Sequence, residues 1–228
     1  MKMDKKDIGG GKKMATAIES KTKIHTRYTK KDGTRVPSVT TVLNVLAKPA
    51  LIDWAWKMGL EGEDYKKHRD DKAEIGSLAH YLILCHIKGE QPDTRNYSQE
   101  QIDKAENCLI SYFEWANGHT ILSLLAEKPL VSEKYGFGGT PDHFALVDEI
   151  ETLVDYKTGK GIYEEYYYQT ASYAKLLEED GHSPKRIMIL NIPRSEDESF
   201  TVKVYKNFER GWQIFYHCLQ IYKLMKEK

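Results

Sequence analysis

The chain has 228 residues, of which 40% are hydrophobic and 30% are charged, and its formal net charge at pH 7 is zero. This length and composition are typical of a globular protein with one main domain. The longest apolar stretch, residues 78–87, is interrupted by His80 and His86, so it is too short and too polar to cross a bilayer. The N-terminus also lacks the apolar segment of a secretory signal. We therefore expect a cytoplasmic protein with no membrane partner.

The charge is distributed unevenly along the chain. Residues 1–50 contain 12 Lys or Arg against 4 Asp or Glu, and the rest of the chain has an acidic excess. A basic arm beside an acidic body fits a nucleic-acid ligand, but a solvated tail with no binding role explains residues 1–22 equally well. Because these residues are rich in Lys and Gly and lack hydrophobic periodicity, we predict a disordered basic tail at 1–22 and a single domain at 23–228.

Short elements are predicted to open the domain. The pattern of residues 25–36, with a Lys-Lys-Asp-Gly turn in its middle, predicts a β-hairpin. Either Ser38 or Thr40 is positioned to cap a short helix that follows. A second helix is expected over residues 50–59, with Trp54 on its buried side.

Two longer helices are predicted next. Residues 72–88 have apolar side chains at helical spacing and are followed by a glycine that ends the helix. Residues 98–117 begin with Ser98 and carry Gln101 three positions later, which is a capping-box pattern. A mainly helical segment therefore extends over residues 37–118.

The hydrophobic period then changes from helical to alternating, which indicates a sheet. The order helix, three strands, helix, strand predicts an α/β domain with a mixed central sheet flanked by helices. The predicted elements are strands at 121–134, 136–147 and 151–158, a helix at 162–180, strands at 185–192 and 200–205, and a closing helix at 208–226.

Charged side chains fall inside the apolar strand predicted at 151–158. Alternation places Asp155 and Lys157 on one face of that strand, and Asp142 precedes them by a distance that a hairpin can close. Two carboxylates that converge at a strand end form an oxygen-rich site for Mg²⁺ or Mn²⁺. A neighbouring lysine can activate a water molecule or stabilise negative charge on a reacting phosphate. The alternative is a surface Asp–Lys pair, which contributes less than about 1 kcal/mol.

Five motifs in the chain follow the order found in a known group of enzymes. The runs GTPD (139–142), VDYKT (154–158) and QTASY (169–173) resemble the motifs of the PD-(D/E)XK nuclease superfamily, and more narrowly those of its RecB-like branch. IGSLAH (75–80) is similar to the helix that carries the motif histidine of that branch. PSVTTVL (37–43) is similar to a segment of phage and mitochondrial genome-maintenance exonucleases.

The resemblance spans residues 25–205 and implies a restriction-endonuclease-like core of order αβββαβ, with a catalytic core at 72–205. It implies a catalytic role for Asp142, Asp155 and Lys157. The implied metal ligands are His80, Asp142, Asp155 and the backbone carbonyl of Tyr156.

Several further roles remain open at this stage. Glu127 matches an acidic residue that is often found on the first strand, although Glu133 competes for that role. His80 shares a helical face with apolar residues, so a core histidine is the alternative to a metal ligand. The predicted DNA contacts are Gln169, Tyr173, Lys160 and Ser38.

The resemblance implies a Mg²⁺- or Mn²⁺-dependent DNA exonuclease that acts on DNA ends in recombination, repair or phage DNA processing, in a bacterial or phage-infected cell. A single-strand annealing or binding protein and further copies of the chain are additional expected partners. The alternatives are a flap- or branch-specific endonuclease, a DNA-binding protein with a vestigial nuclease site, and an RNA nuclease.

No other cofactor is expected. The three cysteines, Cys85, Cys108 and Cys218, fit reduced buried thiols and are too few for a four-cysteine iron–sulfur cluster. The chain also lacks a GxxxxGK[ST] loop, so we expect no use of ATP.

Overall fold

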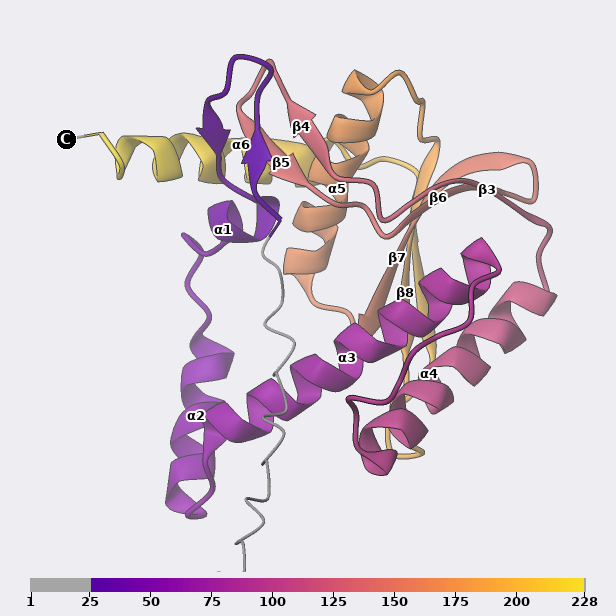
Figure 1. Cartoon of the computed structure of the whole chain (residues 1–228). Coiled ribbons are helices and arrows are strands. Elements are labelled where there is room, and N and C mark those ends of the chain that lie inside the picture. Colours follow the sequence, from indigo (N-terminus) through magenta and orange to yellow (C-terminus); the bar gives the residue numbers. More distant parts are fainter. Residues whose placement is uncertain (1–25, 228) are drawn as a thin grey trace, which may run out of the picture.

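The structure is a computed structural model that describes residues 26–227. The tail predicted at residues 1–22 lies outside the described residues. The centre of the molecule is a five-stranded sheet (Figure 1). Across the sheet, the strands lie in the order β3 (Ile121–Ala126), β6 (His143–Val147), β7 (Ile150–Thr158), β8 (Arg186–Ile192) and β9 (Thr201–Tyr205).

The sheet is mixed, because β7 and β8 are parallel whereas the other neighbours are antiparallel. A parallel pair needs a crossover connection, and α5 (Glu164–Glu179) provides it. The chain passes through α4 (Gln99–Asn117), β3, β6, β7, α5 and β8 in turn. The predicted α/β fold, with its mixed sheet and its order of helix, three strands, helix and strand, is therefore confirmed.

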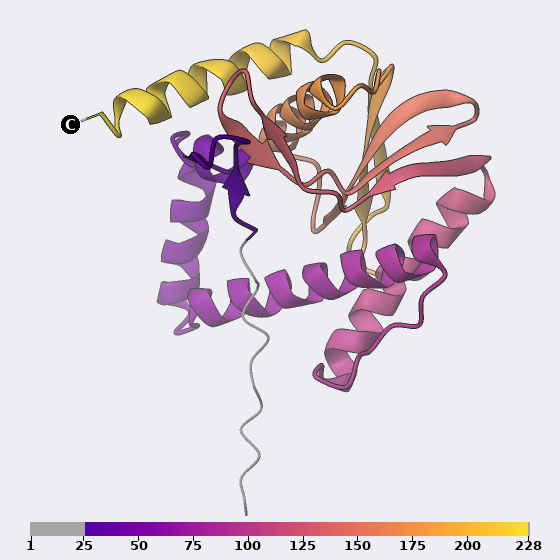
Figure 2. The same cartoon turned by 45° about the horizontal axis from the view of Figure 1, so that its top comes forward.

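Helices cover both faces of the sheet (Figures 1 and 2). Helices α3 (Tyr65–Lys88) and α4 pack on one face, and α5 and α6 (Glu209–Leu224) pack on the other. Alternation along β7 supplies both cores, since Leu153 joins the α5/α6 side and Val154 joins the α3/α4 side, each fully buried. These two cores hold β7 rigidly in the middle of the molecule.

Two strands that were predicted as continuous are each broken, and those predictions were wrong. The strand predicted at 121–134 ends at Ala126, because Glu127 adopts a left-handed backbone conformation with φ 51°. The strand predicted at 136–147 is interrupted around Pro141, which has no N–H to donate to a ladder. The detached pieces, β4 (Leu130–Ser132) and β5 (Phe137–Gly139), pair with each other in a separate small sheet.

The remaining elements agree with the predicted positions within a few residues, with one exception. The hairpin forms from β1 (Tyr28–Thr29) and β2 (Arg35–Val36), and α4 has the predicted capping box at Ser98. Helix α3 begins at Tyr65, seven residues before the predicted start at 72. The cause is Asp64, whose side chain accepts backbone N–H bonds and caps the helix there.

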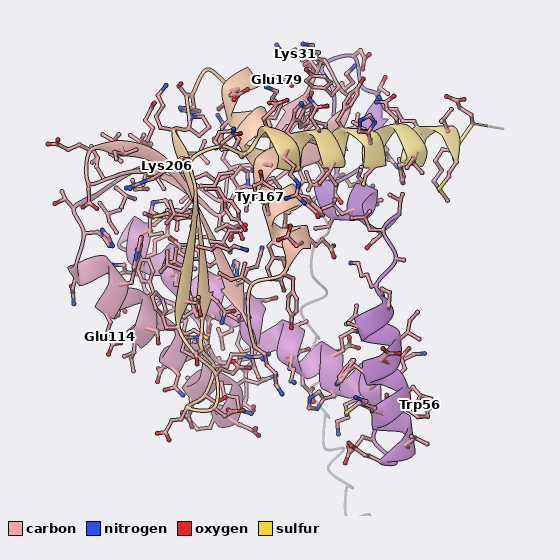
Figure 3. The ribbon with its side chains drawn as sticks, turned by 180° about the vertical axis from the view of Figure 1, so that it is seen from behind. Lys31, Trp56, Glu114, Tyr167, Glu179 and Lys206 are labelled. Carbon is pink, nitrogen blue, oxygen red and sulfur yellow. The ribbon has the colours of Figure 1, made fainter. Side chains whose placement is uncertain are left out.

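Helix α2 (Pro49–Leu60) differs from the others because none of its residues is buried. Trp54 is only half-buried, against the rings of Tyr65 and His68, so its predicted burial is confirmed in part. Trp56 is 63% exposed and points away from the rest of the molecule in Figure 3.

Within residues 26–227, no helix combines the length and apolar composition that crossing a bilayer requires. The three cysteines are buried free thiols, as expected.

Candidate active site

A cleft of about 700 Å³ opens at the C-terminal end of β7. Figure 1 shows this end of the strand beside α3. The carboxyl end of a parallel strand is a common position for a ligand site in open α/β sheets. The cleft is lined mainly by polar and charged side chains, among them Lys72, Ser77, His80, Glu127, Lys157 and Arg194.

Helix α3 approaches the end of β7 very closely. Gly76 makes this possible, since a Cβ at that position would lie 2.7 Å from Oγ1 of Thr158. Lys72, Gly76 and His80 follow one another at intervals of four residues, so they share one face of α3, and all three line the cleft. The small residue thus brings one stripe of the helix against the strand that carries Asp155 and Lys157.

Three potential metal ligands converge in this cleft. His80, Glu127 and Asp142 each offer a ligand atom, and these atoms all lie within 4.8 Å of one another. Nδ1 of His80 is 3.6 Å from Oδ2 of Asp142. Two carboxylates and an imidazole at this spacing form a donor set that fits Mg²⁺ or Mn²⁺.

Glu127 and Asp142 lie at the two points where the strands predicted as continuous are interrupted. The backbone N–H of Glu127 donates to the carbonyl of Asp142 at 3.0 Å, so the two interruptions lie side by side. Oδ2 of Asp142 accepts the backbone N–H of Tyr156 at 2.9 Å. Asp142 is therefore held at the end of β7, close to Asp155, as the hairpin argument predicted. The choice between Glu127 and Glu133 is also explained, because Glu133 accepts a bond from the backbone N–H of Lys31 instead.

Asp155 and Lys157 form a buried ion pair. The Asp155 side chain is fully buried, the Lys157 side chain is 15% exposed, and Nζ lies 2.8 Å from Oδ2. This burial rules out the alternative of a solvent-exposed surface pair. Nζ of Lys157 also lies 4.9 Å from the centre of the Tyr166 ring, a cation–π contact.

The carboxylate of Asp155 is incompletely satisfied. Apart from the ion pair, neither of its oxygens has a hydrogen-bond partner of good geometry among the described residues. Buried carboxylates without such partners are rare and point to a missing ligand. Asp155 is not part of the group formed by His80, Glu127 and Asp142, so its role as a metal ligand, like that of the Tyr156 carbonyl, stays a prediction.

Burial and mutual repulsion perturb the acidic groups. Burial raises the pKa of Asp155 to about 6, against the opposing effect of Lys157. Burial and the nearby Asp142 raise the pKa of Glu127 to about 7. Both shifts arise first from burial and then from repulsion by Asp142, and a bound cation would oppose them.

Attraction between opposite charges sets the pKa values of His80, Asp142 and Lys157. Burial opposes the protonation of His80, but Asp142 outweighs it and raises the pKa of the imidazole. Burial raises the pKa of Asp142, but His80, Lys157 and the backbone N–H of Tyr156 together outweigh it, so the net pKa is lowered. Burial likewise opposes the charge on Lys157, yet Asp155 and Asp142 raise its pKa. Lys157 is therefore held as a cation.

Sequence reasoning missed His143, which lies behind the site. Its Nδ1 lies 2.9 Å from the hydroxyl of Tyr156, and its Nε2 lies 3.1 Å from Oγ of Ser123. Burial lowers the pKa of His143 to about 4, so the ring is neutral and links β3, β6 and β7. Its position directly after Asp142 was the only signal in the sequence.

The predicted DNA contacts occupy different environments. Nε2 of Gln169 donates to the hydroxyl of Tyr173 at 2.9 Å. The Tyr173 ring is only 6% exposed and packs against Gly139, where a Cβ would lie 2.5 Å from it. Lys160 lies in the exposed turn after β7, whereas the Ser38 hydroxyl accepts the N–H of Thr41 and caps α1 (Val39–Leu43). Their roles in DNA binding stay predictions.

No family model matches the chain, and no curated protein matches it. Among solved structures, a provisionally assigned exonuclease from Eubacterium rectale is 12% identical, with a TM-score of 0.44, over 66% of this chain and 65% of that one. LHK-Exo in complex with dAMP is 12% identical over 65% and 77% of the two chains, with a TM-score of 0.40.

LHK-Exo is an alkaline exonuclease from Laribacter hongkongensis. A further structure of it is 13% identical over 66% of this chain and 82% of that one, with a TM-score of 0.34. The aligned part of this chain thus spans slightly less than two thirds of the Eubacterium protein. At this level of similarity, the assignment of roles depends on the residues of this chain.

Proposed function

We propose that the chain is a metal-dependent DNA exonuclease of the PD-(D/E)XK superfamily, related to its RecB-like branch. One observation carries the proposal: His80, Glu127 and Asp142 converge within 4.8 Å beside the buried pair of Asp155 and Lys157. The same residues lie in motifs that resemble those of the superfamily. Buried charges of this kind are costly to a fold, and a catalytic site accounts for their presence.

The donor set favours a hard divalent cation. Glu127 and Asp142, joined by Asp155, supply carboxylate oxygens, which suit Mg²⁺ and Mn²⁺. His80 adds a nitrogen ligand, which Mn²⁺ accepts more readily than Mg²⁺ does. When bound, such an ion would polarise the phosphodiester and lower the pKa of a coordinated water.

Lys157 acts by its positive charge. Because Asp155 and Asp142 raise its pKa, its amine keeps its proton near neutral pH. Among the roles open to a lysine here, this protonated state favours stabilising the negative charge that develops on the phosphate oxygens. Asp155 fixes the direction of the ammonium group through their contact of 2.8 Å.

The decisive test is the digestion of end-labelled single- and double-stranded DNA with Mg²⁺ or Mn²⁺. Wild type should release labelled product only with the ion, and Lys157→Ala should lower the rate by at least about 10²- to 10³-fold while DNA binding persists. A matched control is Lys206→Ala. Lys206 is exposed, and Figure 3 shows it near the end of the sheet that lies opposite the C-terminal end of β7.

The outcomes separate the rival functions. Absence of cleavage of any DNA form by wild type would favour a DNA-binding protein with a vestigial site. Cleavage of covalently closed circular DNA would favour an endonuclease, because an exonuclease needs an end. A labelled RNA substrate tests the RNA nuclease alternative in the same assay.

A further inference from the structure

A second group of charges lies in and beside the same cleft, towards the N-terminal end of α3 from His80. Lys72 and Arg194 both line the cleft, and Lys160 follows the end of β7 by two residues. The pKa of Lys72 is lowered by burial and then by the positive charges of Arg194 and Lys160. Arg194 of the β8–β9 loop and Lys160 of the β7–α5 turn are therefore close enough to repel Lys72 of α3.

The loops that carry these cations are held firmly. The Arg194 guanidinium forms a two-pronged ion pair with Glu198, and its backbone N–H also donates to Glu198 at 3.0 Å. The amide of Asn191 donates to the carbonyls of Gly159 and Ser199, at 3.0 Å each. These bonds tie the turn before Lys160 to the β8–β9 loop.

The two lysines differ from Arg194 because neither forms an ion pair among the described residues. Asp197 nevertheless attracts both of them, and Glu198 attracts Lys72. Glu198 offsets the charge of Arg194, and the two side chains are only 9% and 4% exposed. By contrast, no carboxylate within the described part of the chain lies at ion-pair distance from Lys72 or Lys160. The lysines are thus available to an anion that enters the cleft.

The spacing relates this group to the candidate metal site. Lys72 and His80 lie on the same stripe of α3 and are eight residues apart, which at about 1.5 Å per residue is about 12 Å along the helix. One strand of B-form DNA rises about 3.4 Å per nucleotide. The separation therefore corresponds to roughly three to four nucleotides of a strand that crosses both positions.

We propose that Lys72 and Lys160 bind a second phosphate of the nucleic-acid strand, a few nucleotides from the bond that is cut. Arg194 positions the loop beside them rather than contacting the strand. The inference rests on the proposed function. Its consequence is that strands too short to reach the two lysines bind more weakly than longer ones, although they are cut by the same site.

The test compares Lys72→Gln/Lys160→Gln with the control Lys185→Gln/Lys206→Gln. Both variants remove two positive charges, but Lys185 and Lys206 flank β8 and β9 at the opposite end of those strands. Binding of a fluorescent twelve-nucleotide strand is measured against salt concentration in Ca²⁺, with a gel to establish that the probe stays intact. Cleavage of two- and twelve-nucleotide substrates is then measured in Mg²⁺ or Mn²⁺.

The cleft variant should lose affinity for the longer strand, and the magnitude of the slope of log K against log[salt] should fall by about 0.7, the value for one lost phosphate contact on a single strand. Cleavage of the dinucleotide, which is too short to reach the two lysines, should fall less than cleavage of the longer strand. The control should keep both the slope and the affinity.

Three results would overturn the inference. The first is an unchanged salt slope in the cleft variant, and the second is an equal loss in the control, which would indicate a general effect of net charge. The third is an equal loss for the short and long substrates, which would place the lysines at the reacting phosphate instead. If wild type neither binds nor cuts DNA, the proposed function itself fails, whereas cleavage by wild type with an unchanged slope in the variant rejects only the second phosphate site.

Discussion

The inner end and the rim of the cleft hold charge in different ways. At the inner end, Asp155 and Lys157 are on a central strand and almost inaccessible to water. At the rim, Lys72 is half-buried on a helix and Lys160 is exposed in a turn. A buried charge is costly unless it is paired or bound to an ion, whereas a rim charge costs little and is screened by salt.

This difference separates two kinds of function. Inner charges are fixed by strand geometry, so we expect their loss to stop the chemistry and to change stability. Rim charges reach the ligand through flexible side chains, so we expect their loss to change affinity alone. Four further predictions test this division, ordered from the largest expected effect to the smallest.

The largest effect is expected for Asp142→Asn. The amide oxygen can still accept the N–H of Tyr156, so the fold should persist, but one negative charge leaves the candidate metal site. We expect single-turnover cleavage to fall by about 10³-fold and Mn²⁺ to give less thermal stabilisation. Asp180→Asn is the control, since Asp180 pairs with Lys128 on the surface. A variant that keeps a tenth of the wild-type rate would show that Asp142 does not take part in the chemistry.

Gly76→Ala adds one methyl group between α3 and β7 and should therefore misalign His80 with the charged residues at the inner end of the cleft. The new Cβ would meet Oγ1 of Thr158 at 2.7 Å, forcing α3 away from β7 at a cost of about 1–3 kcal/mol of stability. Displacing His80 by about 1 Å can lower the rate by about 10²-fold. Denaturant unfolding and initial rates measure the two effects.

Two companion variants sharpen that prediction. Gly59→Ala in α2 meets no atom within 4 Å and should stabilise the protein slightly, because alanine favours a helix by about 1 kcal/mol. Adding Thr158→Ala to Gly76→Ala removes the clashing oxygen and should restore much of the stability. If the double variant is no better than Gly76→Ala, close contact with Thr158 is not the cause.

The metal-free protein should lose stability as the pH rises from 4 to 8. The pKa of Asp155 rises from 3.8 to about 6 on folding and that of Glu127 from 4.5 to about 7. Each group therefore favours the folded state most below its unfolded pKa, and this contribution disappears as the pH passes the folded value. The raised pKa of His80 acts in the same direction. His143 acts in the opposite direction, because burial lowers its pKa from 6.5 to about 4, so it offsets part of the loss below pH 6.5. Asp142, whose pKa is lowered, matters only in more acidic solution.

Thermal unfolding with and without Mn²⁺ tests this dependence. Added ion should raise the melting temperature more at pH 8 than at pH 5, because protons compete for the same carboxylates at low pH. Glu127→Gln should reduce the difference. Equal stabilisation at both pH values would mean that the ion binds elsewhere.

Ser38→Ala should have the smallest effect. Its hydroxyl caps α1, so its removal should lower stability by about 1 kcal/mol and leave KM unchanged. Ser98→Ala, which removes the cap of α4, is the matched control. A rise in KM for Ser38→Ala alone would show that this serine contacts the substrate after all.

The sequence was informative where local patterns decide the structure. Alternation of apolar residues identified β7 and the shared face of Asp155 and Lys157. The short distance in sequence between Asp142 and Asp155 predicted a hairpin that brings them together. The choice of Glu127 over Glu133 depended on a left-handed residue and a broken strand, which periodicity does not reveal. Arg194 was missed for a similar reason, because only the tertiary fold brings the β8–β9 loop to α3.

The parallel pairing of β7 and β8 has a consequence for folding. Asp155 pairs with Ile189, so this contact can form only after the intervening helix α5 has been made and has returned the chain to the sheet. Pairings between residues far apart in sequence tend to form slowly. A partly folded or still growing chain should therefore lack the strand that encloses Asp155, and we expect the proposed hydrolytic activity to arise only when the whole sheet is complete.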